Sequence, residues 1–227
     1  MNTRKYIKSK RLTQFRWNNI EVVTQKDFID KDISIKEVLA AVEKKVPNHL
    51  FRGLDAIYVG EFDFLKERDL DALYKDGAIF ISNAKDSLED VADDLTHELA
   101  HLVEKEYGSF LYSDRMVERE FIEKRKNLYF LLKEEGYEVS LPYFLESKYN
   151  PAFDQFLYQE VGYSALSIMT INLFYSPYGT TSLREYFANC FEGFFWDRNT
   201  VRVKDLSPEV YKKLNSLLYD EEIINEY

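Results

Sequence analysis

The segment from Asp86 to Glu106 constrains the fold more than any other stretch of this sequence. Its apolar residues recur every three or four positions, which is the spacing of a helix with one buried side. These residues are Leu88, Val91, Ala92, Leu95, Leu99, Leu102 and Val103. The other side carries His97 and His101, one turn apart, so that both imidazoles could reach the same metal ion. The segment therefore predicts a domain whose core packs against this helix and leaves a chemically active face open.

The five residues from His97 to His101 match the pattern His-Glu-x-x-His. Glu98 is turned about 100° from His97, where it could contact a water on the ion but is poorly placed to coordinate the ion itself. A zinc site of this kind needs a third protein ligand. His49 lies in a predicted turn far upstream, and the chain has a single cysteine, so the third ligand should be a carboxylate.

A second helical segment, residues 182–196, offers that carboxylate. Glu185 and Asn189 are four residues apart, and Glu192 follows on the same face. Such a helix could present Glu185 to the metal, with Asn189 and Glu192 behind it as hydrogen-bonding partners of the ligand. Ser182 and Glu185 also fit a capping box, in which the glutamate folds back onto the helix start. Spacing alone leaves both roles of Glu185 open.

Taken together, the two motif blocks resemble the gluzincin metallopeptidases, and most of all the group of the anthrax lethal factor catalytic domain and the Pro-Pro endopeptidases. The shared features are His-Glu-x-x-His, a distant Glu-Tyr-Phe-Ala-Asn helix, and a tyrosine seven residues before that glutamate. The resemblance covers roughly residues 55–200. It implies that His97, His101 and Glu185 bind Zn²⁺, that Glu98 is the general base, and that Tyr178 faces the reacting carbonyl.

The net charge of −10 is spread unevenly along the chain. Residues 1–20 contain six basic residues and no acidic ones, so the remaining residues carry −16, which is −10 less +6. Such an acidic body argues against a nucleic-acid partner. The basic arm, residues 1–17, lacks the apolar stretch of a signal peptide, and the longest apolar run is too short and too polar to cross a bilayer. We expect no membrane association and a cytoplasmic location, with export by a signal-independent route or as a processed form as the alternative.

Strand patterns come first along the chain and helical patterns follow, which predicts an α+β fold. The expected strands cover residues 19–24, 55–61 and 78–82; the expected helices cover residues 33–46, 114–135, 153–174, 182–196 and 208–218; and a polar connection covers residues 69–76. With the resemblance, this order predicts one zincin-like domain, residues 18–227. Its N-terminal lobe, about 18–107, would hold a small sheet over the active-site helix, and its C-terminal lobe, about 108–227, would be mainly helical.

The strand expected at residues 78–82 precedes the active-site helix directly. If it lies at a sheet edge, Ile79, Phe80 and Ile81 could bind an extended peptide by strand addition. An ordinary covered strand is the equally good alternative.

Three functional hypotheses follow from these patterns. The first is a zinc-dependent endopeptidase with a peptide or protein substrate. The second is a catalytically silent adaptor of the same fold, against which the intact Glu98 speaks. The third is a metal-free helical interaction protein in which His97 and His101 are incidental. For the motif helix itself the alternative is a surface helix whose polar side, including Asp90, Asp94 and Glu104, simply faces solvent.

Overall fold

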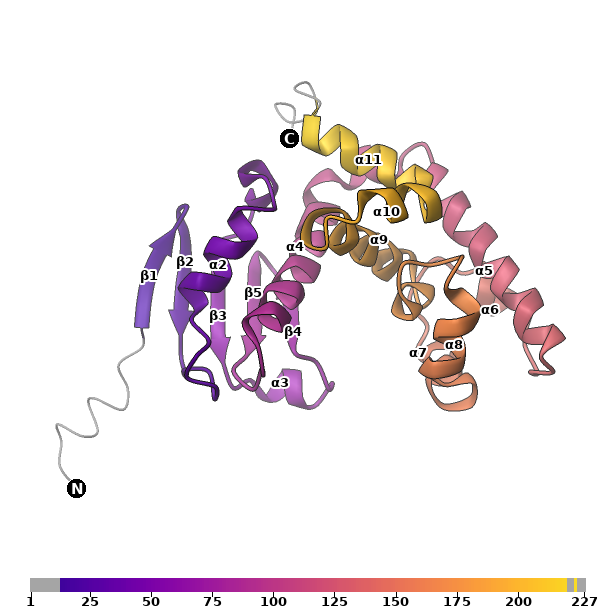
Figure 1. Ribbon diagram of the computed structural model, residues 1–227, viewed down its shortest axis with the longest axis horizontal. Helices are drawn as coiled ribbons and strands as arrows, with labels where there is room; N and C mark the ends of the chain where they lie inside the picture. Colours follow the sequence, from indigo (N-terminus) through magenta and orange to yellow (C-terminus); the bar gives the residue numbers. More distant parts are fainter. Residues whose placement is uncertain (1–12, 220–222, 224–227) are drawn as a thin grey trace. The chain divides into compact units, whose positions relative to one another are not determined.

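The computed structural model describes residues 13–219 and residue 223, and its architecture is α+β (Figure 1). The chain divides into two compact units, residues 1–102 (unit 1) and residues 103–227 (unit 2). The boundary falls inside one continuous helix, α4 (Leu88–Tyr112). The expected boundary between lobes, at residues 107 and 108, lies further along the same helix.

The described part of unit 1 contains one mixed sheet, in the strand order β1-β2-β3-β5-β4. The strands are β1 (Thr13–Trp17), β2 (Ile20–Thr24), β3 (Ala56–Gly60), β4 (Ala72–Lys75) and β5 (Ala78–Ser82). The β2–β3 and β3–β5 pairs are parallel, whereas β1–β2 and β4–β5 are antiparallel. The central strand β3 is apolar along almost its whole length, as expected of a strand covered on both faces.

Two strands fall where none was expected. Thr13–Trp17, assigned to the basic arm, form β1, while residues 1–12 of that arm lie outside the described residues. β4 occupies most of the expected polar connection at residues 69–76. Both strands belong to hairpins with two-residue turns in the left-handed region, Asn18-Asn19 (φ 48° and 67°) and Asp76-Gly77 (φ 50° and 83°). Asp-Gly is among the strongest short-range hairpin signals in a sequence, and asparagine also tolerates the left-handed conformation, but the prediction overlooked both turns.

Of the two alternatives for residues 78–82, the edge strand is wrong and the covered strand is confirmed, because β5 pairs with β3 on one side and with β4 on the other. Its backbone is therefore engaged on both sides and cannot accept a further strand. Ile79 and Ile81 are fully buried. Phe80 stacks on Tyr58 across the β3–β5 pair and meets the rings of Phe62 and Phe64 edge-on. These side chains belong to the core, and the open edge on that side of the sheet is β4.

The remaining elements of unit 1 are α2 (Ile35–Glu43), η1 (Asn48–Phe51), α3 (Asp63–Lys66) and the first part of α4. Figure 1 shows α2 lying across the sheet. At the start of α4 the Ser87 hydroxyl accepts the N–H of Asp90 at 3.0 Å, which satisfies one of the free donors of the first turn. The predicted apolar side of α4 is confirmed: Val91, Leu95 and Leu99 are fully buried.

The described part of unit 2 is helical. After α4 come α5 (Met116–Glu134), α6 (Leu141–Leu145), α7 (Pro151–Gln155), the π-helical turn η2 (Phe156–Val161), α8 (Tyr163–Thr170), the 3₁₀ turn η3 (Pro177–Thr180), α9 (Leu183–Phe191), the π-helical turn η4 (Glu192–Trp196), α10 (Thr200–Leu206) and α11 (Pro208–Tyr219). The helices expected at residues 114–135, 182–196 and 208–218 are confirmed as α5, α9 with η4, and α11. α10 was not expected.

The single buried helix expected over residues 153–174 is wrong. Gly162, with φ 79°, interrupts the segment and separates η2 from α8. Only glycine adopts that backbone conformation without steric cost, which is why the break falls there. The segment is also less buried than its composition suggested, because Tyr158, Ile168 and Ile171 are exposed.

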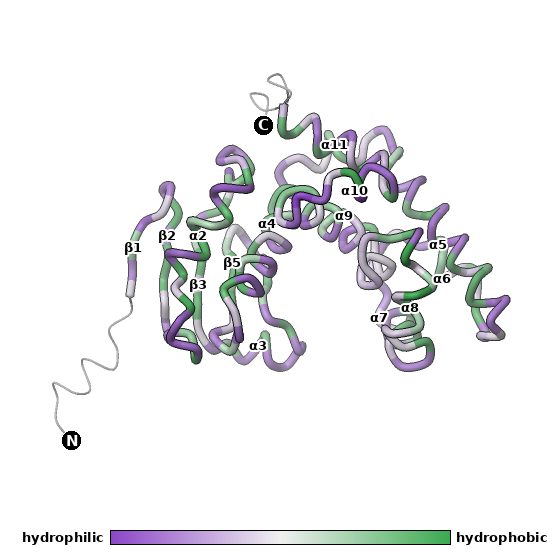
Figure 2. Tube along the Cα trace, in the orientation of Figure 1, coloured by the Kyte–Doolittle hydropathy of each residue, from purple (hydrophilic) through white to green (hydrophobic). Residues whose placement is uncertain are grey.

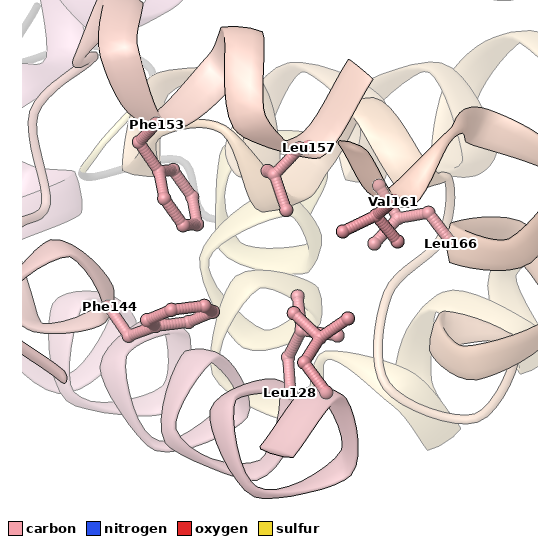
Figure 3. Packing of buried hydrophobic residues seen from close by; sticks show 7 residues of the cluster. Leu128, Phe144, Phe153, Leu157, Val161 and Leu166 are labelled. Atoms are coloured by element: carbon pink, nitrogen blue, oxygen red, sulfur yellow. The ribbon is translucent and has the colours of Figure 1, made fainter. Parts of the chain in front are cut away.

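A cluster of buried side chains forms the core between α5 and the α6–α8 segment. Its members are Leu128, Leu132, Phe144, Phe153, Leu157, Val161 and Leu166. Figure 3 shows Phe153 and Leu157 pointing toward Phe144 and Leu128. Beside this cluster, the buried Arg125 of α5 lays its guanidinium over the Phe153 ring at 4.1 Å from the centroid.

Hydrophilic and hydrophobic residues alternate along α5, as the hydropathy colouring in Figure 2 shows. That pattern is typical of a helix with one buried side. Among the described residues, no helix combines the length and the apolar character needed to cross a bilayer.

Candidate metal centre

His97, Glu98 and His101 form a compact group of possible metal ligands on α4 in unit 1. One ligand atom from each of the three side chains lies within 4.8 Å of the others. The two imidazole rings have their centroids 4.9 Å apart and are nearly perpendicular. His101 and Glu98 are 6% and 7% exposed, whereas His97 is half-buried. Two imidazoles with a nearby carboxylate are a donor set that fits Zn²⁺.

The Glu98 carboxylate is fixed by the backbone of strand β4. Its Oε2 atom accepts the N–H of Tyr74 at 2.5 Å. This contact orients one oxygen of Glu98 toward the sheet edge, and it was not foreseen because it depends on a strand that the sequence pattern did not reveal. A carboxylate held in one orientation beside two histidines is suited to receive a proton from a water at the same place.

Asp94 lies one turn before His97 and Glu98 on α4, and it has a defined partner. Lys85 Nζ lies 2.7 Å from Asp94 Oδ2 and 3.0 Å from Asp71 Oδ2, and the Lys85 side chain is only 11% exposed. Burial raises the pKa of Asp94, while the hydrogen bond and charge of Lys85 and the nearby charge of His97 oppose that rise. The interpretation of Asp94 as part of a solvated helix face is therefore wrong.

Glu104, on the part of α4 that belongs to unit 2, is likewise not a solvated residue. Its carboxylate accepts a hydrogen bond from the Tyr112 hydroxyl, and Arg184 Nε lies 3.5 Å from its Oε2 atom. Burial raises the pKa of Glu104 to about 8; the charge of Glu185 adds to this rise, whereas Tyr112 and Arg184 oppose it. Glu104, Arg184 and Glu185 are therefore electrostatic neighbours within unit 2.

Glu185 lies in the first turn of α9 and is half-buried. The Ser182 hydroxyl accepts its backbone N–H at 3.2 Å, so Ser182 is the N-cap of this helix as the sequence suggested. This bond uses the backbone of Glu185 and not its carboxylate. A cap at Ser182 and a ligand role for Glu185 are thus compatible, although the sequence presented them as alternatives.

Tyr178 lies in η3, the turn before α9, and is half-buried. Burial raises the pKa of Tyr178, and among nearby charges Glu185 contributes most to that rise. The two residues selected by the resemblance are therefore neighbours within unit 2, and the Tyr178 hydroxyl keeps its proton at neutral pH.

Asn189 and Glu192 were expected to support Glu185. Asn189 is buried, and its Oδ1 atom accepts a hydrogen bond from the Ser176 hydroxyl. It also lies close to Gly179, where a Cβ atom would meet Asn189 Oδ1 at 3.1 Å. Asn189 thus ties α9 to the turn that carries Tyr178. Glu192 lies in η4 and is half-buried, and its supporting role stays a prediction.

Comparisons of the chain with models of protein families, with curated proteins and with solved structures gave no match. The resemblance to the gluzincins therefore depends on the motif residues alone.

Proposed function

We propose that this protein is a zinc-dependent endopeptidase of the gluzincin type, with a zincin-like fold. The observation that carries the proposal is the group of His97, Glu98 and His101 on α4, whose ligand atoms lie within 4.8 Å of one another while Glu98 is held by the Tyr74 N–H. A metal-free interaction protein has no need for two part-buried imidazoles and an oriented carboxylate at one place.

Glu185 is the proposed third ligand. Support comes from the motif blocks that carry the resemblance and from the contacts around Glu185 within unit 2. Within unit 2 the charge of Glu185 acts on Glu104, and Arg184, the residue before Glu185, pairs with the Glu104 carboxylate. These contacts connect the first turn of α9 to Glu104 within unit 2, and the coordination of the metal by Glu185 is what we propose beyond them.

When bound, zinc would lower the pKa of its water toward neutrality and polarise the carbonyl of the scissile bond. Glu98 takes the proton of the attacking water and delivers it to the leaving amine. Tyr178, still protonated at neutral pH, donates a hydrogen bond to the oxygen on which negative charge develops. His97, His101 and Glu185 hold the metal and take no part in proton transfer.

Because β5 is not an edge strand, we propose that an extended peptide pairs with the edge strand β4 instead. Asp71 C=O accepts the N–H of Ser82 at 2.7 Å, so the alternation of an antiparallel ladder turns the backbone of Ala72 and Tyr74 away from β5. The bond from the Tyr74 N–H to Glu98 agrees with this alternation. Because the Tyr74 N–H is engaged by Glu98, a peptide added to this edge would pair with Ala72 and lie beside Glu98, which is the place that the chemistry requires.

Digestion of a peptide library by the wild-type protein and by Glu98→Gln tests the proposal. Both proteins should contain one zinc per chain, because Glu98 is not a proposed ligand. Only the wild type should cleave, and the Glu98→Gln variant should lose nearly all of that cleavage. Zinc-loaded wild type that cleaves no peptide would favour the silent adaptor, and wild type without zinc whose melting temperature ignores EDTA would exclude both metal-dependent functions.

A further inference from the structure

Strand β4 is linked to helix α4 at two points within unit 1. The first link is the hydrogen bond from the Tyr74 N–H to Glu98 Oε2. The second link is Lys85, whose ammonium lies between Asp71, the residue before β4, and Asp94 of α4, at 3.0 and 2.7 Å. Lys85 itself belongs to the connection between β5 and α4 and not to either linked element.

The two links follow the same order along both elements. From Asp71 to Tyr74 the extended chain advances about 10 Å, and from Asp94 to Glu98 the helix advances about 6 Å. Two contacts separated in this way fix both the distance and the angle between a strand and a helix. With the Tyr74 contact alone, the short strand could pivot about that point, and the open edge of β4 would change its direction relative to Glu98.

The burial of Lys85 distinguishes it from most ion pairs of the described surface. Its side chain is 11% exposed, whereas Lys26 and Lys66, which both pair with Glu61, are 58% and 59% exposed. Exposed pairs contribute little to stability. A nearly buried ammonium costs desolvation energy that only well-placed carboxylates compensate, and removing it leaves Asp94 as a part-buried charge without that compensation.

We propose that Lys85 is a positioning residue that holds the open edge of β4 at a fixed distance and angle from the Glu98 side of α4. The inference deepens the proposed function and rests on it in one respect: the edge held in this way is the one that would bind the substrate backbone. The fixed position of β4 relative to α4 is a property of the folded chain, and it can be measured without zinc or substrate.

Amide hydrogen exchange of zinc-free protein, followed by NMR, measures how firmly β4 is held against α4. The Tyr74 N–H is the reporter, because its bond to Glu98 must open before it exchanges. In Lys85→Met the Tyr74 amide should exchange about fivefold faster, as expected when a part-buried ion pair is lost. Amides of β3, in the centre of the sheet, should keep their wild-type rates, because the change is confined to the edge.

Three companion variants complete the test. Asp71→Asn removes the strand side of the link at an exposed carboxylate, so it should fold normally and accelerate the exchange of Tyr74 in the same way. Lys85→Arg keeps the charge and should retain wild-type exchange. Lys66→Met, the matched control, removes an exposed pair of the same unit and should change nothing at β4. Unchanged Tyr74 exchange in both Lys85→Met and Asp71→Asn would overturn the proposal.

Kinetics with a fluorogenic peptide chosen from the library then test the link to substrate. Lys85→Met and Asp71→Asn should keep one zinc per chain and raise KM about fivefold, with a smaller change in kcat, because the edge that binds the peptide is displaced while the ligands stay in place. An unchanged KM in both variants would contradict a role of the edge in substrate binding. If the wild type cleaves no peptide, the proposed function fails, while the exchange experiment still decides the inference about Lys85.

Discussion

Replacing Arg125 by methionine should destabilise unit 2 by about 3 to 4 kcal/mol. Arg125 is 1% exposed and lies on α5, where its guanidinium donates to three backbone carbonyls. Nη1 reaches the carbonyls of Glu146 at 3.1 Å and Thr181 at 3.4 Å, and Nη2 donates to that of Tyr143. A single side chain therefore joins α5 to the α6 segment and to the residue just before the α9 cap.

The magnitude follows from two opposing contributions. Losing three hydrogen bonds from a charged donor, one to a buried carbonyl and two to part-buried carbonyls, costs about 5 kcal/mol, and losing the guanidinium over the Phe153 ring costs about 1 more. Against this, burial lowers the pKa of Arg125 from its usual value to about 10, which corresponds to about 3 kcal/mol by which the fold disfavours the charged form. Methionine has no such cost, so the difference of about 3 to 4 kcal/mol remains.

The chain offers a specific probe for this measurement, because it has two tryptophans and only Trp196 lies in unit 2. In a Trp17→Phe background, Trp196 fluorescence during urea unfolding should report a lower midpoint for Arg125→Met. Lys126→Met, one residue further along α5 with an exposed side chain, should stay within about 0.5 kcal/mol of the parent. An Arg125→Met variant as stable as the parent would show that the carbonyl bonds do no more than offset the burial of the charge.

Three further outcomes are expected. Tyr178→Phe should keep its zinc and lose about 100- to 1,000-fold in kcat, as when one donor to a developing oxyanion is removed; a loss below about threefold would remove Tyr178 from the mechanism. Glu192→Gln, the variant of a supporting residue, should weaken zinc binding by about 10- to 100-fold, measured by competition with a chelator. Glu185→Gln should weaken it further, and equal zinc affinities of the two variants would contradict their separate roles. Glu104 has a pKa of about 8 in the folded protein, so between pH 4.5 and about 8 the folded chain keeps this proton while the unfolded chain has lost it. In zinc-free protein, the free energy of unfolding of unit 2 should therefore fall by about 1.4 kcal/mol per pH unit across this range. Urea midpoints across this range should lose that slope in Glu104→Gln, and a slope that persists in the variant would assign it to other groups.

Features that depend on local periodicity were predictable from the sequence. The buried side of α4 and the opposite placement of His97 and His101 follow from a 3.6-residue repeat that no distant contact needs to confirm. The cap at Ser182 and the existence of α9 follow from neighbours within one turn. Each of these predictions concerns residues less than five positions apart.

Features that depend on pairing between distant segments were not predictable in the same way. Whether residues 78–82 form an edge or a central strand is decided by β3 and β4, and β4 itself has four residues, too few to show an alternation. From the sequence, Asp94 and Glu104 could be interpreted as solvated, because their partners lie outside the helical repeat of α4. Lys85, the partner of Asp94, precedes the helix, and Arg184, the partner of Glu104, is 80 residues further along the chain. Three-dimensional packing, rather than residue type, gives these two carboxylates their partners.

The most direct test of the central claim is a crystal structure of the zinc-loaded protein with anomalous diffraction measured at the zinc edge. The account predicts one strong anomalous peak per chain, with His97, His101 and Glu185 as its protein ligands at about 2.0–2.2 Å and Glu98 next to the remaining position. A peak bound by other residues, or one bound by the two histidines with Glu185 directed elsewhere, would contradict the account.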